Sequence, residues 1–150
     1  MTAAQILRRY HRVNESLELL SYGILSYPNY IALRIELARG LYEKGLIEDA
    51  WDHLQLIDFN EQDYLLAKEI YFFCSILLER ESHSYKFFDE LKKKSVRCFA
   101  TLEVLRIDGL TKAKARLLDD FKNKGVFPVL PVVASNMEFF AQEKNLRSEE

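Results

Sequence analysis

The sequence predicts an all-α fold in which helical hairpins stack side by side into a solenoid. A shift of 34 residues places like residues on like: Ala4 on Ala38, Leu7 on Leu41, Val13 on Ile47, Leu20 on Leu54 and Tyr30 on Tyr64. A period of this length is that of one helical hairpin, which cannot bury its apolar face alone and therefore stacks on its neighbours. Only five Gly and three Pro occur among 150 residues, which favours helices over a β fold with many turns.

The expected helices are separated by glycine, proline or short polar turns. They span residues 2–10, 14–26, 29–43, 47–57, 64–80, 83–93, 95–107, 111–124 and 136–146. Gly45 and Gly125 follow the last residues of two of them, where glycine is favoured. In the helix over 95–107, Val96, Phe99 and Leu105 are expected on one inward stripe, together with Leu102, because they recur at helical spacing.

Two of these helices are apolar on more than one side. The helix over 29–43 carries two apolar stripes, one containing Ile35 and Tyr42 and the other Leu37 and Leu41. A helix of this kind is sandwiched between neighbours. The helix over 64–80 is still more apolar, so we expect it either in the core or beside a hydrophobic ligand.

The organisation along the chain predicts a single domain over 1–150. Recognisable repeats cover 1–96, and a divergent helical hairpin covers 97–125. Residues 126–134 are apolar and contain Pro128 and Pro131, so they cannot form a regular helix. We expect this segment to pack on the helices as a strap, or to occupy a groove until a partner displaces it. A C-terminal helix over 135–147 would cap the end of the stack.

Composition excludes several classes of protein. Hydrophobic residues make up 49% of the chain and charged residues 29%, which is unlike a disordered protein. The N-terminus lacks the apolar run of a signal peptide, and no stretch reaches the ~18 apolar residues of a membrane span. Cys74 and Cys98 match no zinc or CxxC spacing. We expect two buried free thiols in a cytoplasmic protein; a disulfide or a redox role is the alternative.

Charge is distributed unevenly along the chain. Residues 1–91 hold 9 Lys/Arg and 15 Asp/Glu, a net charge of −6, whereas residues 92–124 hold 10 and 4, a net of +6. Opposite charges at the two ends favour docking to a complementary partner, or head-to-tail self-association between the acidic 1–91 and the basic 92–124 regions. The alternative is that these charges only solvate helical surfaces.

The hairpin over 31–64 resembles the tetratricopeptide repeat family. Small residues stand where the two helices of that repeat approach closely, here Ala38 and Ala50, and large apolar residues follow at Leu41 and Leu54. Gly45 lies near the turn, as in the family. The chain departs from the pattern near the end of the repeat, where Gln62 replaces the frequent proline. The resemblance implies a right-handed solenoid of about three repeats, followed by the divergent hairpin and the capping helix.

The resemblance also implies a concave groove, lined by the first helix of each hairpin, that binds a peptide or helix of a partner protein. The residues expected in this groove are Arg8, Arg9, Ile35, Glu36, Arg39, Tyr42, Glu69 and Phe73. Arg and Tyr are common hot-spot types at interfaces. The alternative is that Tyr42 and Phe73 belong to the core between repeats and that Arg39 is a solvated surface charge.

Function is therefore expected to be protein–protein interaction by a non-catalytic adaptor or scaffold, with no cofactor and no metal. The three histidines His11, His53 and His83 are isolated and match no metal-ligand or catalytic spacing. One alternative is a small chaperone that holds an apolar segment of a secreted or client protein. Another is nucleic-acid binding through the basic 92–124 block, although the sequence pI near 6.0 argues against it.

Overall fold

The computed structural model describes residues 15, 17–27, 30–62, 64–125 and 127. Every regular element within these ranges is a helix, which confirms the predicted all-α class. A first helix over 17–26 is followed by α2 (Ile31–Glu43), α3 (Ile47–Leu54), α4 (Leu65–Leu77), α5 (Glu81–Ser84), α6 (Phe88–Lys94), α7 (Val96–Asp108) and α8 (Leu110–Lys124). The expected helices over 2–10 and 136–146, and most of the 126–134 strap, lie outside the described residues.

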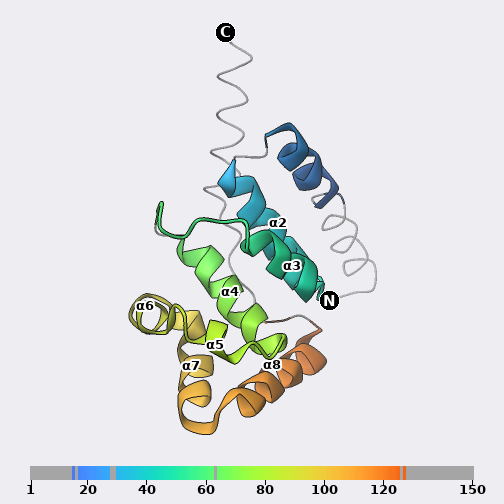
Figure 1. Ribbon diagram of the computed structural model, residues 1–150. Coiled ribbons are helices and arrows are strands. Elements are labelled where there is room, and N and C mark those ends of the chain that lie inside the picture. The colour runs from blue at the N-terminus through green and yellow to red at the C-terminus, as the bar shows by residue number, and fades with distance from the viewer. Residues whose placement is uncertain (1–14, 16, 28–29, 63, 126, 128–150) are drawn as a thin grey trace.

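The helix α4 lies at the centre of the molecule. It contacts α2, α3, α5, α6 and α8 (Figure 1). Its buried residues lie on all sides of the helix and include Ile70, Phe72, Phe73, Cys74 and Ile76. A helix that is apolar all round is stable only when it is enclosed, so the other helices are arranged around α4.

The α2–α3 hairpin packs through small residues, as its sequence predicts. Ala38 of α2 and Ala50 of α3 are both fully buried, and α2 contacts both α3 and α4. Gly45 has a φ of +86°, and the backbone N–H of Leu46 donates to the carbonyl of Leu41 at 2.9 Å. Glycine adopts this left-handed backbone at little cost, which explains why α2 ends there.

The first described helix packs on α2 through two close approaches at glycine. Leu17 and Leu20 form a buried cluster with Leu33 and Leu37 of α2. A Cβ atom placed on Gly40 would lie 2.7 Å from Leu17 Cδ2, and one on Gly23 would lie 3.1 Å from Leu33 Cδ1. The missing side chains therefore let the two helices approach each other at both ends of the contact.

Two predicted helices differ from those observed. The helix expected over 64–80 ends at Leu77, because Glu79 has a positive φ of 57°. The N–H of Arg80 then donates to the carbonyl of Ser75 at 2.8 Å, which closes the C-terminus in the Schellman pattern. The single helix expected over 83–93 is divided into α5 and α6, with a turn between them.

The predicted inward stripe of α7 is wrong for two of its four residues. Leu102 and Leu105 are buried, and Cys98 is buried with them, but Val96 is 92% exposed and Phe99 is 50% exposed. The rotation of α7 is fixed by Ser95, whose hydroxyl accepts a hydrogen bond from the N–H of Cys98 at 3.2 Å and donates to the buried Glu69 of α4 at 2.7 Å.

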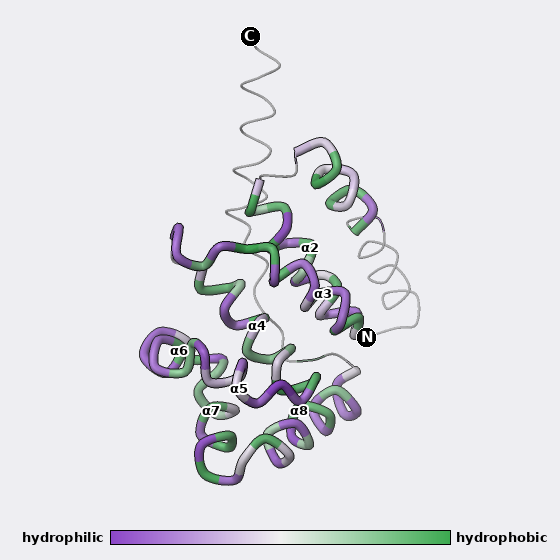
Figure 2. Tube along the Cα trace, in the orientation of Figure 1, coloured by the Kyte–Doolittle hydropathy of each residue, from purple (hydrophilic) through white to green (hydrophobic). Residues whose placement is uncertain are grey.

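The hairpin formed by α7 and α8, the C-terminal hairpin, folds back toward α2. The helix α8 contacts both α7 and α4, and hydrophobic and hydrophilic residues alternate along it (Figure 2). Beyond its end, the Phe127 ring stacks on Phe121 at 4.4 Å between centroids and reaches Tyr42 of α2 at 5.7 Å. This first described residue of the predicted strap therefore packs on the helices.

Replacement of Gly40 by alanine tests the contact between the first helix and α2. Alanine is normally better than glycine in a helix by about 1 kcal/mol, but here the new methyl group meets Leu17. We expect Gly40→Ala to destabilise the fold by about 1 kcal/mol, because overpacking outweighs the gain in helix propensity. Chemical denaturation monitored by circular dichroism measures this change.

The matched variant is Leu17→Ala, alone and combined with Gly40→Ala. In the Leu17→Ala background the space at Gly40 is open, so the same glycine substitution should become neutral or stabilising. An equal cost in both backgrounds would contradict the close approach.

Candidate interaction site

The structure places the described members of the predicted groove in the interior. Ile35, Glu36, Tyr42, Glu69 and Phe73 are all less than 5% exposed, and Arg39 is 11% exposed at its side chain. Arg8 and Arg9 lie outside the described residues. These five side chains therefore do not line an open surface, and their role in binding a partner stays a prediction.

Packing of the C-terminal hairpin explains this burial. The rings of Tyr42 and Phe73 stack at 6.0 Å between centroids, and the Phe127 ring lies 5.7 Å from that of Tyr42. Burial raises the pKa of Tyr42 well above its ordinary value, and nearby Cys74, Cys98 and Asp120 act in the same direction. The phenol is therefore surrounded by α4, α7 and α8, as the core alternative for Tyr42 and Phe73 expects.

Arg39 lies between two carboxylates on its own helix. Its Nε donates to Glu36 Oε2 at 3.0 Å, and its Nη1 donates to Glu43 Oε1 at 2.8 Å. Arg39 is thus ion-paired and mostly buried, and its role in binding a partner stays a prediction. The other carboxylate oxygen of Glu36, Oε1, is buried and has no hydrogen-bond partner among the described residues, an arrangement that costs stability.

Glu69 belongs to a separate polar contact between α4 and the C-terminal hairpin. Its Oε2 accepts from the Ser95 hydroxyl at 2.7 Å and lies 3.9 Å from Arg97 Nη1. Burial raises the pKa of Glu69, while the Ser95 hydrogen bond and Arg97 oppose that rise. The neighbouring Lys68 is also buried and donates to both oxygens of Glu90 on α6 at 2.8 Å.

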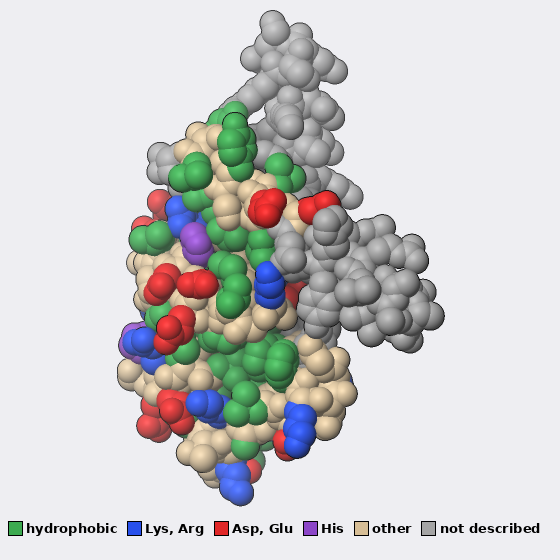
Figure 3. Space-filling view, turned by 90° about the vertical axis from the view of Figure 1, so that its right-hand side faces the viewer, with side chains coloured by type: hydrophobic (Ala, Val, Ile, Leu, Met, Phe, Trp, Pro, Cys, Tyr) green, Lys and Arg blue, Asp and Glu red, His purple; other side chains and the backbone are tan. Residues whose placement is uncertain are grey.

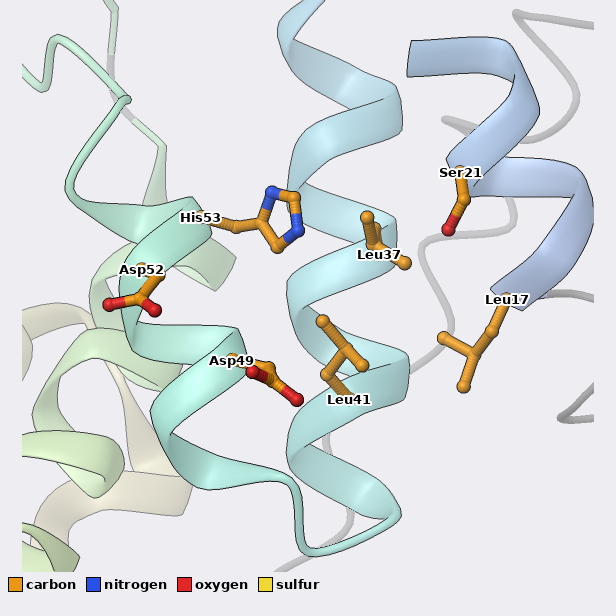
Figure 4. A pocket seen from close by; sticks show the side chains of 7 residues that line it. All are labelled: Leu17, Ser21, Leu37, Leu41, Asp49, Asp52 and His53. Atoms are coloured by element: carbon orange, nitrogen blue, oxygen red, sulfur yellow. The ribbon is translucent and has the colours of Figure 1, made fainter. Parts of the chain in front are cut away.

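A surface pocket lies on the other side of α2, between the first helix, α2 and α3. Its volume is about 290 Å³. The lining side chains come from all three helices: Leu17, Ser21, Leu37, Leu41, Asp49, Asp52 and His53 (Figure 4). Leu17 and Leu37 point toward each other and Asp49 points toward Leu41, whereas the Asp52 carboxylate lies on the outer side of α3.

The surroundings of His53 at this pocket favour its neutral form. Arg34 Nη1 lies 3.0 Å from His53 Nδ1, and because arginine can only donate, Nδ1 accepts and the neutral ring carries its proton on Nε2. Burial lowers the pKa of His53, and the Arg34 guanidinium lowers it further. The pocket therefore combines an apolar floor with two carboxylates and a neutral imidazole.

Sequence reasoning missed this pocket. Asp49, Asp52 and His53 are near one another on α3, but Leu17 and Ser21 join them only because the first helix packs against α2 through Gly23 and Gly40. The spacing of Asp49 and His53, one helical turn apart, was the signal that placed two polar groups on one face.

Removal of the Phe127 ring is expected to loosen the packing of Tyr42, which lies near both cysteines. Cys74 and Cys98 are buried free thiols, as predicted, and burial raises the pKa of Cys98 to about 12. We expect Phe127→Ala to cost about 3 kcal/mol and to accelerate labelling of these thiols by a water-soluble reagent. Leu118→Ala, at a half-exposed position of α8, is the control; equal labelling in both would contradict the expected loosening.

A second prediction concerns how the stability of the fold depends on pH through His53. Because the pKa of His53 is lower in the folded than in the unfolded state, the unfolded chain binds more protons, and stability is lost as pH falls through the ordinary histidine pKa. When pH falls from about 7.5 to about 5.5, the melting temperature of His53→Asn should therefore fall less than that of the parent protein. Asparagine keeps an acceptor for Arg34. Identical losses in the two proteins would contradict the altered pKa.

Comparison with protein families, with curated proteins and with solved structures finds no match to this chain. Within the described ranges, none of the helices has the length and apolar character needed to cross a membrane. The same residues contain no group of three or more metal-ligand side chains that could hold an ion.

Proposed function

We propose that this chain is a non-catalytic protein-interaction module built from tetratricopeptide-like hairpins, and that it binds a short segment of a partner protein. The observation that carries the proposal is the pocket in which side chains of three successive helices converge. Support for the repeat architecture comes from α2, which contacts both its hairpin partner α3 and the first helix of the next hairpin, α4. The buried Ala38 and Ala50 lie at the family's two small positions.

The size of the pocket limits what it can hold. A volume of about 290 Å³ is at the lower limit of the ~300–1,000 Å³ typical of small-molecule and cofactor sites. It suits one or two side chains of a peptide better than a cofactor. Leu17, Leu37 and Leu41 offer an apolar floor to an aliphatic side chain of the partner.

The charge of the pocket indicates which residues of the partner stand beside that aliphatic side chain. Asp49 carries negative charge at the rim and Asp52 lies on the outer side of α3, while the Arg34 cation beside the neutral His53 offsets part of that charge. A lysine or arginine beside the aliphatic side chain would pair with Asp49, and a wrong partner with an acidic flank would be repelled. The recognised segment is therefore an aliphatic residue with a basic neighbour.

The two other functions considered from the sequence receive less support. The apolar helix expected to hold a chaperone client is α4, and α4 is enclosed by its neighbours. Within the basic 92–124 block, Arg97 lies 3.9 Å from Glu69, Lys114 3.6 Å from Glu79 and Lys94 3.5 Å from Glu90. Part of the positive charge available for phosphates is thus used inside the protein. A cytoplasmic location remains part of the proposal, supported by two cysteines that are both free.

Selection from a random peptide display library tests the proposed specificity. The parent protein should enrich peptides in which Lys or Arg adjoins Leu, Ile or Met. Asp49→Lys should weaken binding of a selected peptide at least about tenfold, which corresponds to about 1.4 kcal/mol, because attraction becomes repulsion. Titration of the labelled peptide by fluorescence anisotropy gives this ratio.

The matched control is Glu61→Lys, which makes the same change of charge at an exposed position between α3 and α4. It should leave affinity nearly unchanged, while Leu37→Ala should weaken binding without altering the preference for basic flanks. Enrichment of acidic peptides, or equal loss in the Asp49 and Glu61 variants, would exclude the pocket as the binding site.

A further inference from the structure

Two helices at opposite ends of the molecule each carry an apolar face that points away from the core. The first helix lies at one end and α7 at the other (Figure 1). On the first helix, Leu19 is 60%, Tyr22 69% and Leu25 82% exposed; we call these residues, with Glu18, the head face. On α7, Val96, Phe99 and Ile107 are at least half exposed; with Arg97 and Arg106 they form the tail face.

Both helices have the pattern of a helix packed on two sides. The first helix buries Leu17 and Leu20 against α2 while its head face lies on the opposite side. The helix α7 buries Cys98, Leu102 and Leu105, and Val96, Phe99 and Ile107 lie on the other side of it. In a repeat stack such helices are interior, whereas terminal helices normally have a polar outer face.

The exposed apolar residues gather rather than scatter. Leu19, Tyr22 and Leu25 recur at every third residue and so lie along one side of the first helix. Figure 3 shows hydrophobic side chains at the upper end of the face in view, at the level of that helix in Figure 1, with a larger hydrophobic area below them. Isolated exposed apolar residues need no explanation, but a contiguous group along one helix indicates an interaction surface.

Charge distinguishes the two faces and selects the occupant. The head face carries Glu18, and no Lys or Arg occurs between residues 13 and 33. On the tail face, Arg106 pairs with Glu103 of the same helix at 2.8 Å, so its excess positive charge comes from Arg97, whose side chain is 49% exposed; the surrounding 92–124 block has a net charge of +6. An apolar acidic face at one end and an apolar basic face at the other are complementary to each other.

We propose that the head face of one copy of this chain binds the tail face of a second copy, so that the stack of helices continues from one molecule to the next. Because the two faces differ, the contact is heterologous, and any open assembly has one unused head face at one end and one unused tail face at the other. The contact involves one helix from each copy, which is small for an interface, so assembly should be reversible and depend on concentration. This inference does not depend on the pocket or on its proposed ligand.

Sedimentation velocity over a range of concentrations tests the assembly with the full chain. The parent should show a weight-average mass that rises with concentration. A head variant, Tyr22→Glu with Leu25→Glu, and a tail variant, Val96→Lys with Ile107→Lys, should each remain monomeric. All four positions are strongly exposed, so circular dichroism should show that both variants stay folded.

Mixing the two variants provides the decisive measurement. The head variant keeps an intact tail face and the tail variant an intact head face, so an equimolar mixture should form a dimer and nothing larger. The control is Leu56→Glu, an exposed leucine outside both faces, which should assemble like the parent.

Three results would overturn the proposal. One is a parent protein that stays monomeric up to about 100 μM, a concentration that would detect even a weak contact; the faces would then be covered by another part of the chain or by a different protein. Another is assembly of both single-face variants as efficient as that of the parent. The last is a mixture of the folded variants that stays monomeric.

Discussion

The enclosure of α4 is the constraint on which the rest of the structure depends. Its buried residues surround the helix, and Ile70, Phe73 and Ile76 have no exposed surface at all. Removing such side chains from water is the main favourable term in folding, but a single hairpin partner can cover only part of a helix. The hairpin partner of α2, the α5–α6 segment and α8 therefore all contact α4, and the expected open groove beside it is filled.

Polar contacts decide how the covering helices are oriented. Apolar packing alone is tolerant of rotation, because α7 offers apolar residues on two sides. The hydrogen bond from Ser95 to the buried Glu69 is directional, and Ser95 also caps the start of α7. Lys68 and Glu90 fix α6 on α4 in the same way. Buried ion pairs contribute little net stability, since desolvation offsets their attraction, but the loss of one partner would leave an uncompensated charge. We infer that these contacts select one arrangement of α6 and α7 among several of similar apolar burial.

The sequence could predict what depends on local pattern. The class of the fold, the α2–α3 hairpin with Ala38 and Ala50 at its contact, and the end of α2 at Gly45 all follow from spacing and glycine chemistry. The two-sided apolar pattern of α2 also showed that it would be sandwiched. The rotation of α7 could not be predicted in this way, because two apolar stripes of similar length compete and the choice depends on Glu69, which is distant in sequence. The position of α8 and Phe127 against α4 and Tyr42 is likewise non-local, and it reversed the expected exposure of Tyr42 and Phe73.

Because the residues of the expected groove are buried, the accessible side of α2 is the opposite one. One side of this helix, with Ile35 and Tyr42, belongs to the core around α4, while Leu37 and Leu41 line the pocket with the first helix and α3. The two apolar stripes of α2 thus have different roles: one joins the helix to the core, and the other forms the floor of the pocket. The position of the pocket follows from the first helix, since Gly23 and Gly40 permit the close approach that brings Leu17 and Ser21 to its edge. The same helix has its head face on its opposite side, so its packing on α2 determines both where the pocket lies and how the end of the stack is presented.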